Sequence, residues 1–386
     1  MTVFNLLPNS EIEEVWEWKT DVLTTIKGDE SRLSIRDIPR ISMRTSFGPL
    51  TDAEKRNLNL LIVQNIKIVT DTPVWPYVSP INQTTSSGAA RVYFDNDRVP
   101  VADDGYVILY NPNTGAIYGH VVDTTETDGA TLSTNVAVDI TTQWLAILGF
   151  QAKIKNDAQF RLGQNASVLE MEFEADTDIA VQRPGSSASL TTLDSLNVLE
   201  RKFFEGASEN YEYPRETLDW ETGTRADYSQ WLHARISGSR SFITNRLLSP
   251  TDFDYWRLFF DTVKGSWKPF LLSTQQKDMT LNTTLSAAGT SMSIVEDIDA
   301  DMLAFGTWKH FEIVYSDKTY SYHTITSATG TGPVTVNFTP ALPNDAKVTS
   351  VSRISHLLKC RMADRVTLTH GTTATQISFD ITTTDD

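Results

Sequence analysis

The sequence has one cysteine, Cys360, among its 386 residues. A single cysteine excludes an intrachain disulfide framework and any zinc or iron–sulfur site built from a cysteine cluster. No apolar run approaches the roughly 18 residues that a transmembrane helix needs. Residues 1–10 lack a basic stretch followed by an apolar one, so we expect no signal peptide. These absences favour a soluble protein that folds in a reducing compartment.

Basic residues are also scarce. Lys and Arg number 33 against 49 Asp and Glu, which gives a formal net charge of −16. So acidic a chain is a poor partner for nucleic-acid phosphates and for anionic membrane surfaces. Hydrophobic residues, at 40%, are numerous enough for real cores, and 49 threonines favour strands because threonine is β-branched. We therefore expect a mainly β protein.

The sequence lacks the common catalytic motifs. It has no P-loop, nucleophile elbow, zincin motif or dinucleotide fingerprint, and its six histidines do not have metal-ligand spacing on a convincing helix. The oxygen-rich stretches 95–104 and 297–301 do not follow the full EF-hand pattern, so we interpret them as solvated turns. We expect no enzymatic activity, no cofactor and no metal.

What the sequence does contain is an internal repeat, best seen in two helices. Thr51 and Glu54 have the spacing of a capping box at the start of a helix. The second helix is predicted to start at Ser249-Pro250 and to end near Gly265, where a left-handed residue is favoured. Further segments match in the same order at offsets of 193 to 206 residues. They are 17–20 with 219–222, 74–78 with 267–271, 108–120 with 313–323, and 171–174 with 377–380.

This order predicts a tandem duplication; the alternative is two unrelated β-rich domains. The first module would span 1–180, a Pro-, Gly- and Ser-containing linker 181–197, and the second module 198–386. Each module is predicted to be a β-sandwich or barrel with one packed helix and a small all-β insertion, at about 84–145 and 280–350. The expected strands include 34–42, 240–243, the hairpin 106–118, and the closing pairs 150–160 with 167–175 and 356–363 with 375–382.

Two groups of side chains are candidates for function. Alternation along 168–174 places Glu170, Glu172 and Glu174 on one acidic strand face. We interpret them either as lining a channel or as a solvated surface. The tryptophans that we expect at packing or subunit contacts are Trp16, Trp18, Trp220 and Trp267.

One stretch resembles a known family. Trp16-Glu17-Trp18-Lys19-Thr20-Asp21-Val22, followed by Gly28-Asp29-Glu30-Ser31-Arg32 and Pro39-Arg40, is similar to a run found in distal tail and baseplate proteins of siphoviruses, the bacteriophages with long non-contractile tails. The segment 249–272, with its Gly265-Ser266-Trp267-Lys268-Pro269-Phe270 end, looks like a segment of the same class. The second half departs from the pattern after Trp220, where it reads Gly223-Thr224-Arg225.

The resemblance implies a tail-tube-like fold and a structural role in the tail tip of the virion, with the protein made in the bacterial cytoplasm. Two modules per chain would let three chains form a pseudo-sixfold collar between the sixfold tail tube and the threefold hub. A true hexamer is the alternative. The expected partners are then further copies of the chain, the tail tube, hub and tape measure, and passing DNA that is not specifically bound, with no membrane. Two other classes stay open, a carbohydrate- or receptor-binding module and, less favoured, a cell-wall hydrolase.

Overall fold

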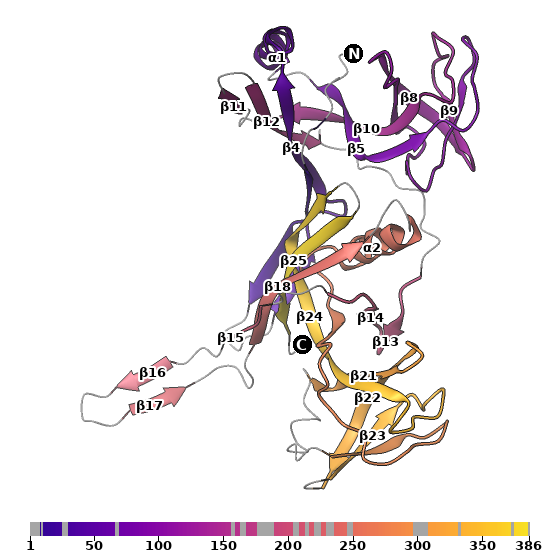
Figure 1. The fold of residues 1–386 in the computed structure, drawn as a ribbon. Coiled ribbons are helices and arrows are strands. Elements are labelled where there is room, and N and C mark those ends of the chain that lie inside the picture. Colours follow the sequence, from indigo (N-terminus) through magenta and orange to yellow (C-terminus); the bar gives the residue numbers. More distant parts are fainter. Residues whose placement is uncertain are drawn as a thin grey trace.

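The computed structural model describes residues 8, 11–24, 30–65, 69–155, 159–162, 167–175, 189–203, 208–212, 216–219, 225–228, 235–244, 250–295, 308–330, 333–371 and 374–384. These residues form a mainly β protein with a large antiparallel sheet and the helices α1 and α2 (Figure 1). Below, the N-terminal half means residues 11–175 and the C-terminal half residues 189–384, as far as they are described.

The N-terminal half is built around one helix and a set of strands paired in series. Strand β4 pairs with β12, β12 pairs with the end of β10, and β10 pairs with β5 and β7. The bounds are β4 (Arg40–Leu50), α1 (Asp52–Asn65), β5 (Thr70–Pro80), β10 (Leu145–Ile154), β11 (Gln159–Leu162) and β12 (Ser167–Ala175). Thr51 Oγ1 accepts from the Glu54 amide, and the Glu54 carboxylate accepts from the Thr51 amide at 2.7 Å. The predicted capping box therefore starts α1.

A small β unit leaves this sheet through β7. It contains β6 (Arg91–Tyr93), β7 (Tyr106–Tyr110), β8 (Ile117–Glu126) and β9 (Gly129–Leu132). Strand β7 pairs with β8, β8 with β9, and β9 with β6. Its core holds side chains such as Val92, Phe94 and Val122, each fully buried. The predicted hairpin at 106–118 is confirmed as β7 and β8.

The C-terminal half has its own ladder. Strand β18 pairs with β25, β25 with β24, and β24 with β19 and β21. The bounds are β13 (Thr192–Leu193), β14 (Leu196–Leu199), β18 (Arg235–Thr244), α2 (Pro250–Val263), β19 (Phe270–Ser273), β24 (Val351–His370) and β25 (Thr375–Thr383). Because β14 pairs in parallel with β19, the end of the range expected as a linker, 181–197, belongs to this sheet.

The second small β unit follows α2 and has a separate core. It contains β20 (Ser291–Ile294), β21 (His310–Tyr315), β22 (Tyr320–Thr329) and β23 (Val334–Thr339), with β21 paired to β22, β22 to β23, and β23 to β20. Residues such as Met279, Phe311 and Phe338 form a hydrophobic cluster distinct from the main one.

Strand β1 (Ile12–Glu17) joins the two halves. One edge pairs with β4 of the N-terminal half, and the other edge pairs with residues 365–370 of β24. The strands β12, β4, β1, β24, β25 and β18 are therefore hydrogen-bonded in series, all antiparallel. We call β1 and its two ladders the β1 junction.

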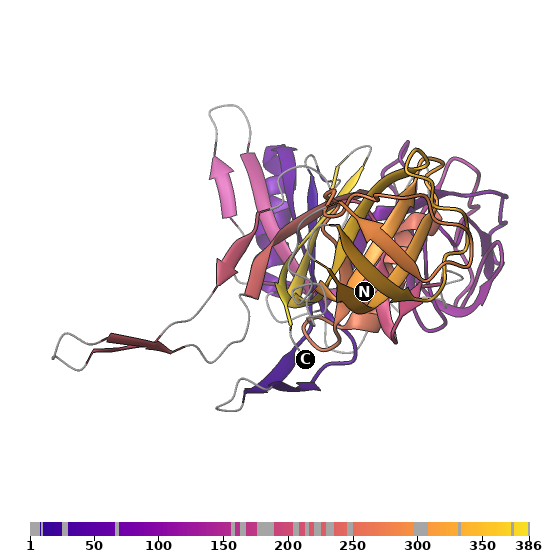
Figure 2. The ribbon, with the colours of Figure 1, turned by 90° about the horizontal axis from the view of Figure 1, so that it is seen from below.

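Two hairpins accompany these strands. Hairpin β2 (Thr20–Thr24) with β3 (Glu30–Ser34) lies between β1 and β4 in the chain. Hairpin β16 (Glu216–Asp219) with β17 (Arg225–Tyr228) lies between β15 (Asn210–Glu212) and β18. The β16–β17 hairpin projects away from the rest of the protein (Figures 1 and 2).

Two sequence expectations are wrong, and another falls largely outside the described residues. The segment 34–42 is not one strand, because β3 ends at Ser34 and β4 begins at Arg40. Of the match of 17–20 with 219–222, residues 220–222 lie outside the described residues; Glu17 ends β1 in the central sheet, whereas Asp219 ends β16 in the projecting hairpin. A shared acid–Trp–x–Thr pattern does not distinguish a sheet strand from a hairpin strand. The closing strands 167–175, 356–363 and 375–382 are confirmed, whereas the expected strand 150–160 is not one strand, because β10 ends at Ile154 and β11 begins at Gln159. Strands β10 and β24 begin five residues before 150 and 356.

Candidate functional site

The series of strands through the β1 junction has one polar face. Register partners share a face of a sheet, so the ladder relates Glu172 to Arg44 and Arg44 to Glu13. It continues from Glu13 to Thr369, Gln376 and Ile243. The same face carries Glu170, Glu174, Arg40, Glu17, Arg365, Ser378 and Asp380. A polar surface thus crosses from one half of the chain to the other without a break in hydrogen bonding.

The opposite face is the core. Trp16 and Trp18 are each 1% exposed, and both rings contact Phe260 of α2, at centroid distances of 5.8 and 6.2 Å. Trp256 of α2 stacks on Phe260 and packs against Phe242 of β18. The tryptophans near the N-terminus therefore pack on the helix of the C-terminal half. Trp16 and Trp18 are therefore buried packing residues, and the contact is made within one chain.

A buried polar cluster lies at the centre of the β1 junction. Glu14 of β1 is 3% exposed, and its carboxylate accepts hydrogen bonds from Trp16 Nε1 at 2.6 Å and from the Tyr77 hydroxyl at 3.2 Å. His370 Nε2 of β24 lies 2.9 Å from Glu14 Oε2, and its Nδ1 lies 3.0 Å from Thr375 Oγ1. Because Glu14 accepts from both halves, its carboxylate ties β5 to β24.

Asp364 forms a second tie beside the junction. Its carboxylate accepts from the amide and hydroxyl of Thr20 and from the amide and hydroxyl of Ser266, at 2.8 to 3.1 Å. The Trp18 amide donates to the Asp364 carbonyl at 2.8 Å. Burial alone would raise the pKa of Asp364, but the hydrogen bonds from Ser266 and Thr20 outweigh it, and the pKa lies below its ordinary value.

Gly265 makes this close approach possible. It has a φ of +68°, and a Cβ at this position would lie 2.6 Å from Asp364 Oδ1 and 3.0 Å from the Trp18 Cβ. The glycine predicted as the end signal of α2 therefore serves a second purpose. It leaves room for the N-terminal segment to lie against the end of the helix.

The three candidate channel-lining glutamates share the polar face, as predicted, but each has a basic neighbour. Glu174 pairs with Arg40 at 3.0 Å, Glu172 with Lys155 at 2.8 Å, and Glu170 lies 3.8 Å from Arg44. Their side chains keep between 21% and 31% of their surface exposed. The face therefore alternates in sign instead of being uniformly acidic. Sequence alternation identified the face but not the opposite charges on β4 and directly after β10.

The other two candidate tryptophans differ from this pair. Trp267 is half-buried at the end of α2, and Lys264 and Lys268 lie over its ring at 5.5 and 4.6 Å. Trp220 lies outside the described residues. Trp267 thus has the amphipathic environment of a contact residue, whereas Trp16 and Trp18 belong to the core.

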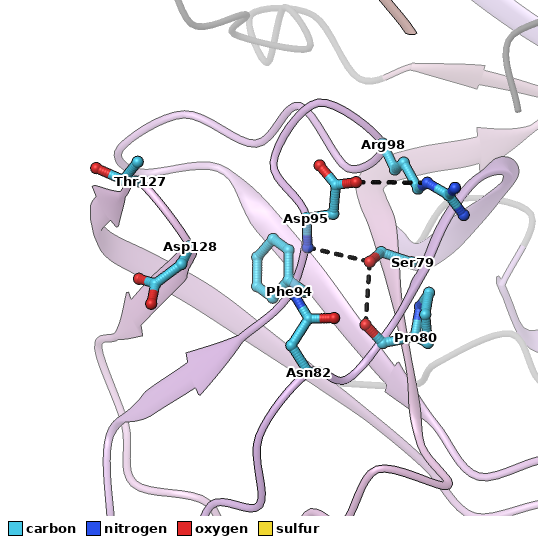
Figure 3. A pocket seen from close by; sticks show the side chains of 8 residues that line it. All are labelled: Ser79, Pro80, Asn82, Phe94, Asp95, Arg98, Thr127 and Asp128. Atoms are coloured by element: carbon cyan, nitrogen blue, oxygen red, sulfur yellow. Dashed lines mark hydrogen bonds and ion pairs between the residues drawn. The ribbon is translucent and has the colours of Figure 1, made fainter. Parts of the chain in front are cut away.

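A pocket of about 420 Å³ lies where the β6–β9 unit meets β5 (Figure 3). Its lining includes Asn82, Arg98 and Asp128, and the Ser79 hydroxyl accepts from the Asp95 amide at 3.0 Å. Arg98 lies 3.4 Å from Asp95, and Arg91 pairs with Asp128 at 2.8 Å. No tryptophan lines this pocket, and Phe94 is fully buried, so the pocket offers no exposed ring for stacking on a sugar.

Within the described residues, no group of three or more His, Cys, Asp or Glu side chains could hold a metal ion. Asp103, one of the oxygen-rich turn residues, accepts from the amide and hydroxyl of Thr125. The other acidic stretch, 297–301, lies outside the described residues. Also within the described residues, no helix combines the length and apolar character that spanning a membrane requires.

A scan of protein-family models gives no match to this chain, and no curated protein matches its sequence significantly.

Proposed function

We propose that the protein is a ring-forming structural component of a siphovirus tail tip, with no catalytic role. In this proposal the two halves are tandem copies of one tail-tube-like module, each with a flanking helix and a small all-β insertion. Three chains form a pseudo-sixfold collar between the sixfold tube and the threefold hub. The β1 junction carries the proposal, because there the sheet of one half of the chain continues into that of the other.

The order of strand pairing supports the tandem reading. The series β4, β12, β10 and β5 in the N-terminal half corresponds to β18, β25, β24 and β19 in the C-terminal half. In each half a helix follows the first strand of the series, and the insertion leaves through the strand that pairs with β10 or β24. Unrelated β domains would not be expected to share this order, because many antiparallel topologies are available.

Equivalent hydrogen bonds within the insertions support it further. The Ser87 amide donates to Asp139 Oδ1 at 2.8 Å, and the Ala287 amide donates to Asp345 Oδ1 at 2.8 Å. The bridge between Thr85 and Ile140 has its counterpart between Leu285 and Ala346. The segments Asn82-Gln83-Thr84-Thr85-Ser86 and Asn282-Thr283-Thr284-Leu285-Ser286 carry this pattern in the sequence.

The strand pairing across the β1 junction supports the proposed ring assembly. Closed rings need the same head-to-tail contact at every step. One such contact, from the first module to the second, already exists inside the chain as the β1 junction. The polar face, with charges of both signs, would line the central channel. The net charge of −16 would keep DNA from adhering to the protein as a whole.

The symmetry of the assembled object tests the proposal. Native mass spectrometry of the full-length protein over a range of concentrations, with cryo-EM of the phage particle, should show a ring of three chains around the tail axis. Six chains would replace the pseudo-sixfold collar by a true hexamer. A monomer in the particle, or absence of the protein from the tail, would reject the structural role.

A further inference from the structure

We infer that the free edge of β15 pairs with the free edge of β11 in a second copy of this chain. This inference rests on the proposed function and specifies its intermolecular contact. The partner is the same protein, and the recognition chemistry is the addition of a strand to an open sheet edge. The β1 junction provides the template, because it is the same kind of contact made within one chain.

In the β1 junction, the strand that precedes a hairpin lies beside the first strand of its own half and reaches the other half with its second edge. β1 pairs with β4 on one side and with residues 365–370 of β24 on the other. Beyond the strand, the Trp18 amide continues the contact by donating to the Asp364 carbonyl. The contact across this edge combines backbone pairing with side-chain hydrogen bonds such as those of Glu14 with His370 and of Thr20 with Asp364.

Strand β15 lies beside β18 in the same way that β1 lies beside β4. It pairs antiparallel with β18, precedes the β16–β17 hairpin, and in the described part of the chain has no other strand partner. It is held in place by Arg240, which donates to the Ser208 carbonyl at 2.8 Å and pairs with Glu209 at 2.7 Å. All three residues of β15 are exposed, and Tyr211 keeps 63% of its surface accessible.

The direction of the Tyr211 amide follows from the ladder. Tyr211 is opposite Ile236, and the Ile236 amide donates to Thr383 Oγ1 on the side of β25. In an antiparallel ladder, opposite residues exchange either both hydrogen bonds or none. Because the Ile236 amide is directed toward β25, this pair exchanges none, and the amide and carbonyl of Tyr211 point away from β18. They are the donor and acceptor that a further strand would use.

The complementary edge belongs to β11. Strand β11 pairs with β12, as residues 366–370 of β24 pair with β25. In the C-terminal half the opposite edge of that segment takes up β1. In the N-terminal half, within the described residues, β12 is the only strand paired with β11. Each chain thus has two different open strand edges, one at β15 and one at β11. Because the edges differ, the β15–β11 contact can repeat head to tail from one copy to the next.

The position of the β16–β17 hairpin is consistent with the proposed β15–β11 contact between copies. The β2–β3 hairpin is fastened to the C-terminal half, where the Arg32 guanidinium donates to the Ser266 carbonyl at 3.1 Å and Lys264 pairs with Asp37 at 2.7 Å. The β16–β17 hairpin stands clear of its own chain (Figure 2). In the assembled ring it would lie near the end of α1 of the next copy. Lys153 and Lys155, at the end of β10, would face the exposed Glu212 of β15.

A proline at position 211 tests the contact. Tyr211→Pro removes the outward amide and leaves the ladder with β18 intact, because that amide makes no bond to β18. Tyr211→Ala is the matched control, since it removes the ring but keeps the amide. At concentrations where the wild type forms rings by native mass spectrometry, we expect Tyr211→Pro to be monomeric and Tyr211→Ala to remain in rings. Circular dichroism should be unchanged in both variants, and so should the unfolding midpoint at concentrations low enough for the wild type to be monomeric as well.

Hydrogen–deuterium exchange of the wild type gives a second measurement, which does not depend on how the proline variant folds. Amides of 208–212 and 159–162 should exchange at least tenfold more slowly in the ring than in the monomer. If rings form but neither segment gains protection, or if Tyr211→Pro still forms rings, the β15–β11 contact is wrong and the ring function stands. If the wild type forms no ring in solution or in the particle, both proposals are rejected.

Discussion

Glu14 and His370 are 356 positions apart in the chain, yet Glu14 Oε2 lies 2.9 Å from His370 Nε2, and both side chains are almost fully buried. The carboxylate also accepts from Trp16 and Tyr77, so one side chain satisfies donors from three strands. A buried acid is retained at such a place only if its hydrogen bonds compensate for the loss of water. The junction between the halves is therefore specified by a polar cluster as well as by apolar packing.

Replacing Glu14 should destabilise the whole chain. Glu14→Ala leaves three buried donors without their acceptor, and we expect a loss of about 3–5 kcal/mol in the free energy of unfolding. Chemical denaturation of wild type and variant measures this loss in the free energy of unfolding. Glu13→Ala is the control, because Glu13 lies on the polar face of the same strand, 37% exposed, with Arg365 at 3.7 Å. It should change stability by less than about 1 kcal/mol. Equal effects of the two variants would contradict the role given to Glu14.

Glycine at position 265 is required for two separable reasons. In Gly265→Ala the alanine would be strained by the positive φ, and its methyl group would also clash with Asp364 and Trp18. Gly115→Ala would have only the backbone strain, because Gly115 has a φ of +70° and no atom lies within 4 Å of the position of an added Cβ. We expect about 1–2 kcal/mol for Gly115→Ala and a clearly larger loss for Gly265→Ala, both measured by thermal unfolding. Similar losses would show that the close approach at Gly265 relaxes easily.

Acid should weaken the contact around Asp364. The pKa of this carboxyl is lowered in the folded protein, so its contribution is present above the unfolded value, 3.8, and is lost as pH falls through the folded pKa. Asp364→Asn should cost about 1–2 kcal/mol at neutral pH, since its charged hydrogen bonds are partly exposed to water. The stability difference between wild type and variant should then shrink on acidification below pH 4. A difference that is constant with pH would indicate that the charge does not matter.

The polar face should influence the passage of DNA. Changing Glu170, Glu172 and Glu174 together to Gln leaves their partners Arg40, Arg44 and Lys155 uncompensated, so the face becomes basic. Phage particles carrying this variant should assemble normally but release DNA more slowly, because unpaired cations attract phosphate. Changing the same residues to Lys should slow release further. Unchanged ejection kinetics in both variants would remove these residues from the channel.

Local signals in the sequence predicted local structure well. Thr51 with Glu54 predicted the start of α1, and the alternation along 168–174 predicted both faces of β12. The hairpin at 106–118 followed from its turn residues. Each of these features is determined by residues close together in the chain, where capping, turn chemistry and period-two alternation act directly.

Features made by distant residues could not be predicted in this way. Trp16 and Trp18 were recognised as packing residues, but nothing near them in sequence identifies Phe260 or β24 as their partner. The match of 17–20 with 219–222 illustrates the same point, because Glu17 ends β1 whereas Asp219 ends β16, and strand pairing rather than the tetrapeptide decides which segments correspond. A usable signal was present elsewhere, in the similar segments that follow Asn82 and Asn282.

The β1 junction has a consequence for how the polypeptide reaches its native state. β1 leaves the ribosome long before its partner, because the segment of β24 that completes its pairing is made roughly 350 residues later. Until then one border of β1 has no native neighbour, and open strand borders promote association of nascent chains. Pairing over such a separation is also slow. Biogenesis of this protein should therefore be sensitive to translation speed and to chaperones that shield early strands.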